Sequence, residues 1–114
     1  MRILSVLLLM ILVTAFTCRK SEREENSYAT YSYKQTQCAD PWQTGSASSD
    51  NQTITNVTNY LKAEGLYVAG VQVKADDIAA VCLACQCKTG KTIYVTSLSD
   101  HSTKAKFLRL GFQQ

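Results

Sequence analysis

Apolar residues recur at intervals of three and four in a stretch near the middle of the chain, at Ile54, Val57 and Leu61. These intervals place them on one face of an α-helix. Asp50 has a side chain suited to the N-cap, and Gly65 has the conformational freedom that the residue after a helix often needs. The pattern predicts a helix over residues 51–64.

An alternation with a period of two follows in YVAGVQVK, residues 67–74. This period predicts a half-buried β-strand, because successive side chains of a strand point to opposite faces of the sheet. One face of the strand would carry Tyr67, Ala69, Val71 and Val73. The opposite face would carry Val68, Gly70, Gln72 and Lys74.

The last third of the chain predicts a second strand and a second helix. TIYVTS, residues 92–97, has the β-branched and aromatic composition of a strand, and KTGK before it, residues 88–91, predicts a tight loop. A helix is expected over residues 101–110, with Ser99 or Asp100 as its N-cap.

The segment before the first helix is rich in tyrosine. Residues 28–38, YATYSYKQTQC, place Tyr31, Tyr33 and Gln35 on one side of an extended chain, which predicts a short strand or arm. Trp42, in the loop that follows, is expected to cap the hydrophobic core rather than to act as a ligand platform.

The order of these elements indicates the fold class. Asp76 and Asp77 are expected to cap a short helical turn through IAAVCLAC, so the cysteine cluster would lie on or just after that turn. The order arm, helix, strand, cysteine turn, strand, helix predicts an α+β fold, a small two-layer sandwich with two helices packed on one face of a short β-sheet. A chain of 114 residues has room for one such domain. Because so small a core buries little apolar surface, covalent staples are expected.

Residues 1–17, MRILSVLLLMILVTAFT, predict a signal peptide. Arg2 supplies the positive start, and the apolar run that begins at Ile3 and ends at Val13 is too short for a bilayer span but fits the apolar region of an export signal. Cleavage after Ala15 would release a secreted protein. Cleavage before the cysteine at position 18 would leave that cysteine at the new N-terminus.

The segment after this cysteine favours the second cleavage. Residues 19–27, RKSEREENS, contain no apolar side chain and balance three basic against three acidic groups, as a solvated tether would. An apolar leader, a cysteine and a charged tether resemble the small bacterial envelope lipoproteins, whose cysteine is acylated. The resemblance implies lipidation at Cys18, a lipid-anchored tether over 18–28 and a single domain over 29–114. It also implies a membrane-anchored protein on the periplasmic or surface side of the cell envelope, without indicating an activity.

With Cys18 acylated, four cysteines remain: Cys38, Cys82, Cys85 and Cys87. An even number suits disulfide pairing outside the cytoplasm. A bond between Cys85 and Cys87 is disfavoured because their spacing makes a strained ring. Two pairings remain open: Cys38–Cys87 with Cys82–Cys85, and Cys38–Cys85 with Cys82–Cys87. Either would tie the arm to the cysteine turn and stabilise the fold by about 4 kcal/mol in the chain-entropy model.

The same cysteines allow three hypotheses about function. The favoured one is a non-enzymatic accessory or binding module, stapled by disulfides, with no cofactor and with an unknown protein partner. The second is a metal-binding protein in which the four thiolates hold zinc or Cu(I). The third is a thiol–disulfide oxidoreductase using Cys82 and Cys85, although no thioredoxin-like βαβ pattern surrounds them.

Other function classes are excluded by composition and spacing. A formal charge of +3 and a pI near 8.6 are too small to indicate nucleic-acid binding. CKTGKT imitates a phosphate-binding loop, but Cys85 stands where the first glycine is required and a strand follows, so nucleotide binding is rejected. His101 is the only histidine, which excludes a multi-histidine metal site. The acidic residues form no obvious catalytic pair, and we predict that the protein is not an enzyme.

Overall fold

The computed structural model describes residues 27–42 and 49–114. The predicted signal peptide over 1–17, the lipidation site Cys18 and the tether as far as residue 26 lie outside the described residues, and they stay predictions. In the part of the chain that is described, no helix has the length and hydrophobicity needed to cross a membrane.

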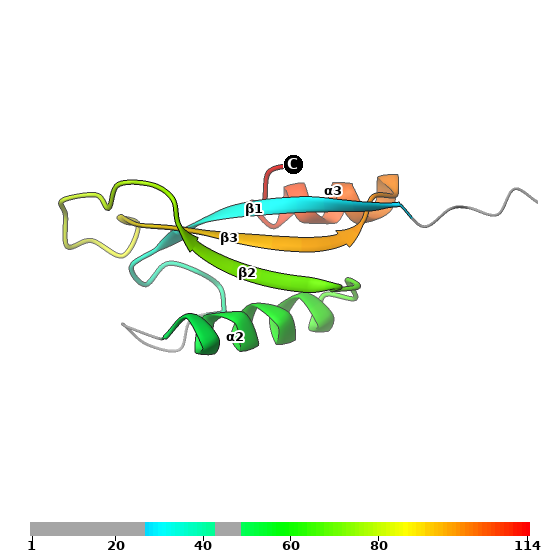
Figure 1. Ribbon diagram of the computed structural model, residues 1–114, viewed down its shortest axis with the longest axis horizontal. Coiled ribbons are helices and arrows are strands. Elements are labelled where there is room, and N and C mark those ends of the chain that lie inside the picture. The colour runs from blue at the N-terminus through cyan, green and yellow to red at the C-terminus, as the bar shows by residue number, and fades with distance from the viewer. Residues whose placement is uncertain (1–26, 43–48) are drawn as a thin grey trace, which may run out of the picture.

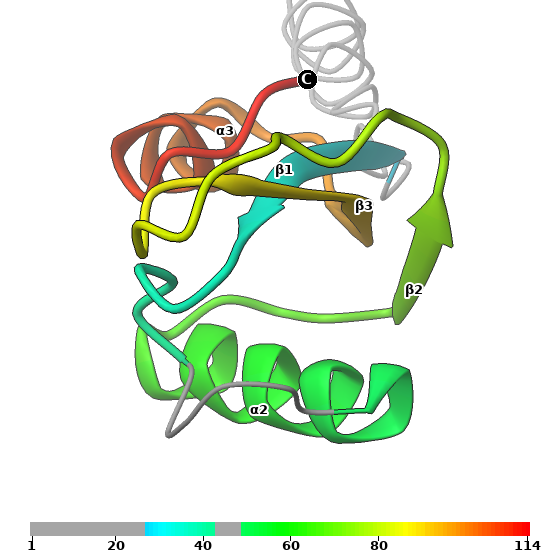
Figure 2. The ribbon, with the colours of Figure 1, turned by 90° about the vertical axis from the view of Figure 1, so that its left-hand side faces the viewer.

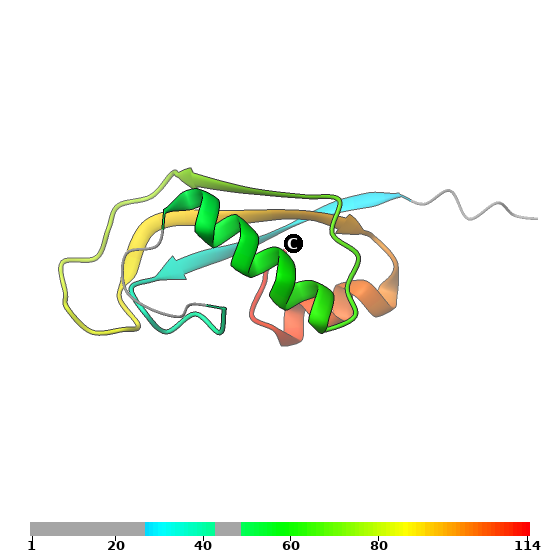
Figure 3. The ribbon, with the colours of Figure 1, turned by 90° about the horizontal axis from the view of Figure 1, so that it is seen from below.

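Two helices and three strands make up the described fold, in the order β1 (Tyr28–Thr36), α2 (Asp50–Ala63), β2 (Gly70–Ala75), β3 (Lys88–Leu98) and α3 (His101–Arg109) (Figure 1). β3 is the central strand of an antiparallel sheet with the order β1-β3-β2. Figures 2 and 3 show both helices on one side of this sheet. The predicted α+β sandwich of two layers is confirmed.

The core lies between the sheet and the two helices. Its buried side chains come from β1, β3, both helices and the adjoining turns: Tyr31, Trp42, Val57, Leu61, Leu66, Ile93, Val95, Phe107 and Phe112. At its centre the rings of Tyr31 and Phe107 are stacked, with centroids 4.0 Å apart. Trp42 packs edge-on against Tyr33 and also contacts Phe112, so its predicted place at the core is confirmed.

Strand register explains why one face of the sheet is apolar and the other polar. Tyr31 of β1 and Val71 of β2 both pair with Val95 of β3, and these side chains face the helices. The next residue along each strand points the opposite way, so Tyr94 of β3 and Gln72 of β2 lie on the open face. Within the described residues, the helices therefore cover one face of the sheet and leave the other open.

Both helices end in the same local motif, a glycine followed by an apolar residue. Gly65 and Gly111 follow the C-caps with φ of +76° and +90°, a conformation that glycine adopts without steric cost. The next residues, Leu66 and Phe112, turn back into the core, and the Leu66 N–H donates to the Leu61 carbonyl at 3.0 Å. This hydrogen bond satisfies a carbonyl that the end of the helix would otherwise leave without a partner.

Helix α2 begins one residue earlier than predicted. Ser49 is the N-cap, with its hydroxyl accepting from the Gln52 N–H, and Asp50 is the first helical residue. The two positions compete because serine and aspartate are both good caps. At α3 the N-cap is Asp100, one of the two predicted residues, and its carboxylate accepts from the Thr103 N–H at 2.9 Å.

The strand predicted over residues 67–74 begins later, at Gly70. Tyr67 and Ala69 are exposed, whereas Val68 packs against the core. The physical reason is the end of α2: once Leu66 has turned into the core, the next three residues carry the chain from the helix layer to the sheet. The predicted alternation is correct only from Val71 onward.

The predicted helical turn through IAAVCLAC is wrong. Residues 76–87 form no helix, and two of their backbone N–H groups bond across to β3 instead, from Asp77 to the Gly90 carbonyl and from Ala80 to the Lys88 carbonyl. Those amides are thereby withdrawn from the i to i−4 pattern that a helix requires. We call residues 76–87 the disulfide loop.

The predicted tight loop KTGK is also wrong, because all four residues belong to β3. Gly90 nevertheless interrupts the strand: its φ is +84°, and the register to β1 shifts so that Thr36 pairs with Lys88 while Lys34 pairs with Thr92. One residue of β1 thus faces three of β3, which is a β-bulge. Gly90 does adopt the positive φ that a turn glycine often has, but here this conformation forms a β-bulge within β3 instead of ending the strand.

Candidate functional site

The four domain cysteines form two disulfides, Cys38–Cys85 and Cys82–Cys87, with Cα atoms 4.4 and 6.0 Å apart. This is one of the two pairings that the sequence leaves open. The other pairing, with a local Cys82–Cys85 bond, is not formed. The oxidoreductase hypothesis requires Cys82 and Cys85 to pair with each other, and in the described fold each is bonded to a different cysteine.

The long-range disulfide joins the end of β1 to the disulfide loop. Backbone hydrogen bonds run alongside it, from the Gln37 N–H to the Cys87 carbonyl at 2.9 Å and from the Cys38 N–H to the Cys85 carbonyl at 3.2 Å. The predicted link between the arm and the cysteine segment is therefore confirmed. Within residues 27–42 and 49–114, no cluster of three or more histidine, cysteine or acidic side chains is placed to hold a metal ion.

The disulfide loop exposes aliphatic side chains. Ile78, Val81 and Leu83 are 89%, 103% and 103% exposed. The loop is nonetheless fastened at its base, because the Cys82–Cys87 bond closes its second half and Gly90 lies directly against its backbone. A Cβ at Gly90 would stand 2.8 Å from the Ala79 nitrogen and from the Asp77 oxygen, so no larger residue fits without moving the loop.

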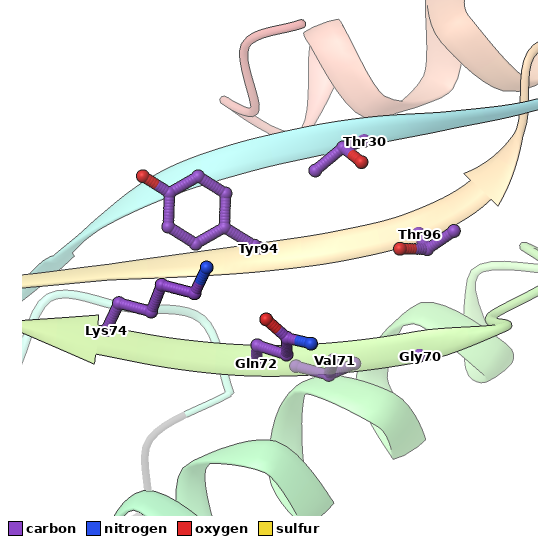
Figure 4. Close-up of a pocket in the computed structure, with 7 residues that line it drawn as sticks. All are labelled: Thr30, Gly70, Val71, Gln72, Lys74, Tyr94 and Thr96. Carbon is purple, nitrogen blue, oxygen red and sulfur yellow. The ribbon is translucent and has the colours of Figure 1, made fainter.

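A second feature is a shallow groove on the open face of the sheet, with a volume of about 320 Å³ (Figure 4). We call it the sheet groove. Its lining comes from all three strands: Thr30, Gly70, Val71, Gln72, Lys74, Tyr94 and Thr96. Register sets two of the cross-strand contacts, since Thr96 pairs with both Thr30 and Gly70.

Charged groups gather at the Lys74 end of the groove. Asp76 accepts hydrogen bonds from the hydroxyls of Thr92 and Tyr94, and these bonds hold the pKa of its carboxyl below the ordinary value. Lys34 lies 3.9 Å from Asp76 and 3.2 Å from Asp77. Asp76 and Asp77, predicted as helix caps, therefore serve as partners for side chains of β1 and β3.

Lys74 has a different environment from Lys34. Its ammonium lies 5.3 Å from the centroid of the Tyr94 ring, a cation–π contact. Among the described residues, the ion pairs are those of Lys34 and Lys91, so Lys74 has no carboxylate partner there. Lys74 is thus the cation lining the sheet groove that lies outside the ion pairs of the described residues.

Asp40 is the buried acid among the described residues, and its role is structural. It accepts from the Thr36 N–H at 3.1 Å and from the Thr36 hydroxyl at 2.7 Å, which closes the turn after β1. Burial raises the pKa of the Asp40 carboxyl, because desolvation disfavours the charged form more than these bonds favour it. The pKa of Tyr33 is raised to about 12. Burial is the largest cause, and the negative charge of Asp40 is the second.

The raised pKa of Asp40 predicts a pH dependence of stability. The folded state binds this proton more tightly than the unfolded chain, so the associated stability is present at low pH and is lost as the pH rises through the folded pKa, above the ordinary value of 3.8. Asp40→Asn should remove this loss. Urea unfolding of both proteins across the acid range should show the wild type losing stability relative to the variant as the pH rises.

Taking the difference between wild type and variant cancels the contribution of the other acids to the pH dependence of stability. Asp76, Asp77 and Asp100 have lowered pKa values and act in the opposite direction, but they are the same in both. A difference in unfolding free energy that stays constant with pH would contradict the assignment of Asp40 as the group with the raised pKa.

The four predicted cysteines and the sheet groove thus lie in two separate places. The four cysteines meet at the base of the disulfide loop, as expected. The sheet groove was not predicted, although the sequence already placed Gly70, Gln72 and Lys74 on one side of a strand. The missing information was the strand register, which brings Tyr94 and Thr96 beside them.

No protein-family model, no curated protein and no solved structure matches this chain. The function is therefore inferred from the disulfide loop and the sheet groove themselves.

Proposed function

We propose that the protein is an exported, non-enzymatic binding module, anchored through a lipid at Cys18, that binds a protein partner through its disulfide loop. Two features support export and binding. The two disulfides fit an oxidising compartment outside the cytoplasm. The loop that they fasten offers an apolar surface to a partner.

The exposure of Ile78, Val81 and Leu83 carries the proposal. Burying three aliphatic side chains at an interface would contribute about 5–9 kcal/mol, against an association cost of similar size. A loop already fastened by a disulfide and by bonds to β3 loses less conformational freedom on binding than a free segment does. The same surface left uncovered would favour aggregation.

The position of the loop favours a partner away from the anchoring membrane. Tyr28 pairs with Leu98 at one end of β1, and Thr36 pairs with Lys88 at the other end, next to the disulfide loop. A strand of nine residues spans about 27 Å. The chain toward Cys18 continues from Tyr28, and Figure 1 shows the start of β1 at the opposite end of the sheet from the disulfide loop.

Photocross-linking in the source organism tests this proposal. A photoreactive amino acid placed at Val81 of the full-length protein should give a discrete cross-linked species containing a second protein. Replacing Ile78 and Leu83 by serine should lower the yield at least about tenfold, because most of the apolar contact area is lost.

Leu108 provides the matched control, since it is an exposed leucine on α3, 49% exposed and outside the loop. The same probe at Leu108 should not give that species. Equal cross-linking from both positions would show non-specific contact and would contradict the proposal. Cross-links from Val81 into lipid would instead identify the loop as a membrane contact and would also contradict it.

A further inference from the structure

We propose that the sheet groove is a binding site for an acidic saccharide, a pyranose that carries a carboxylate. This site lies apart from the exposed side chains Ile78, Val81 and Leu83 of the disulfide loop and does not depend on them. The inference rests on the shape of the groove, on the hydrogen-bonding groups along it and on the charge at one end.

The shape comes from Gly70. Nothing lies within 4 Å of the position that a Cβ would occupy there, so the missing side chain leaves open space above β2. Tyr94 and Lys74 stand at one end of this space and Thr30 and Thr96 at the other (Figure 4). A volume of about 320 Å³ is at the lower limit for small-molecule sites, which suits one or two sugar rings.

The lining suits a ligand with many hydroxyl groups. Thr30 and Thr96 each offer a hydroxyl that can donate and accept, and the Gln72 amide offers both functions on one planar group. Sugar hydroxyls also donate and accept, so they can pair with such a row without leaving a polar group unsatisfied. A purely apolar ligand would leave these groups unpaired as it displaced their water.

The ammonium of Lys74, which lies outside the ion pairs of the described residues, favours an acidic ligand. Asp76 accepts from the Tyr94 hydroxyl, and the Tyr94 ring holds the Lys74 ammonium at 5.3 Å from its centroid. Lys34, by contrast, is engaged by Asp77 at 3.2 Å. Lys74 is therefore the available cation of the groove, and Tyr94 is a positioning residue for it. A carboxylate is the complementary group, since it forms a charge-assisted hydrogen bond with an ammonium.

Binding is tested with the full-length protein in detergent, isotopically labelled for NMR. D-Glucuronate, D-glucose and inorganic phosphate are the three probes. Glucuronate should shift the amide signals of Gly70, Gln72 and Thr96, glucose should bind at least about tenfold more weakly because it cannot pair with Lys74, and phosphate should not shift these signals.

Three variants locate the site. Lys74→Gln should lower glucuronate affinity about tenfold or more and leave glucose affinity unchanged. Gly70→Leu should abolish binding of both sugars by filling the groove, while the open space at this position lets the sheet persist. Lys104→Gln makes the same charge change at an exposed position on α3 and should have no effect.

Several outcomes would overturn the inference. They are equal affinity for glucose and glucuronate, phosphate binding with the same shifts, or no shift at tens of millimolar glucuronate. A Lys74→Gln variant that binds glucuronate normally would also overturn it. The Ile78 and Leu83 serine variant should bind glucuronate as the wild type does, so failure of the partner proposal and failure of this one are distinguishable.

Discussion

Replacing Cys38 and Cys85 together by serine should lower the free energy of unfolding by about 4 kcal/mol. The bond joins residues 47 positions apart, and the chain-entropy model gives a loss of that size for such a loop. Small domains have total stabilities of about 5–15 kcal/mol, so this loss would remove much of the stability. Urea denaturation of the non-reduced full-length protein measures it.

The second disulfide is the matched control. Cys82 and Cys87 are only 5 residues apart in sequence, so the same model gives about 2 kcal/mol for replacing both by serine. The effect of that pair should be concentrated in the disulfide loop, detected as faster hydrogen exchange at residues 76–87. Equal losses for the two pairs would contradict the view that the long-range bond is the main covalent staple.

Phe107→Ala should cost about 3–5 kcal/mol, the usual range for a fully buried phenylalanine. Phe107 is the one fully buried side chain of α3, and its ring stacks on Tyr31 at 4.0 Å. Because α3 has no other deeply buried anchor, the helix should separate from the sheet before the whole domain unfolds. Hydrogen exchange of α3 amides, measured together with urea denaturation, tests both parts of this expectation.

Leu108 again supplies a control on the same helix, because its side chain is half exposed. Leu108→Ala should cost less than about 1 kcal/mol. Tyr31→Phe keeps the stacked ring and removes only the hydrogen bond to the Leu98 carbonyl, 3.0 Å long, so it should cost about 1 kcal/mol. If Phe107→Ala were no worse than Leu108→Ala, Phe107 would not be the anchor of α3.

The bulge of β3 at Gly90 lies between the two proposed sites. On one side of Gly90 lies the base of the disulfide loop, and on the other side β3 continues as the floor of the sheet groove. Asp76 links them, since it follows β2 at the start of the loop and holds Tyr94 in the groove. A protein partner at the loop and a saccharide on the sheet face can therefore be bound by one domain without overlap.

Local features were predictable from the sequence because they depend on residues close together in the chain. The helices over 50–63 and 101–109 follow from apolar spacing and capping residues, and both endings follow from a glycine before an apolar residue. The argument against a Cys85–Cys87 bond is local in the same sense, because it depends only on the spacing of the two cysteines. The α+β class followed from the order of these elements.

Tertiary structure decided everything that depends on distant residues. The choice of Cys85 rather than Cys87 as the partner of Cys38 follows from how the end of β1 meets the disulfide loop, and spacing along the chain carries no information about that meeting. Residues 76–87 are not helical because β3 supplies partners for their backbone amides. The sheet groove exists only because strand register sets Gly70 opposite Thr96, and register is a property of the assembled sheet, not of any one strand.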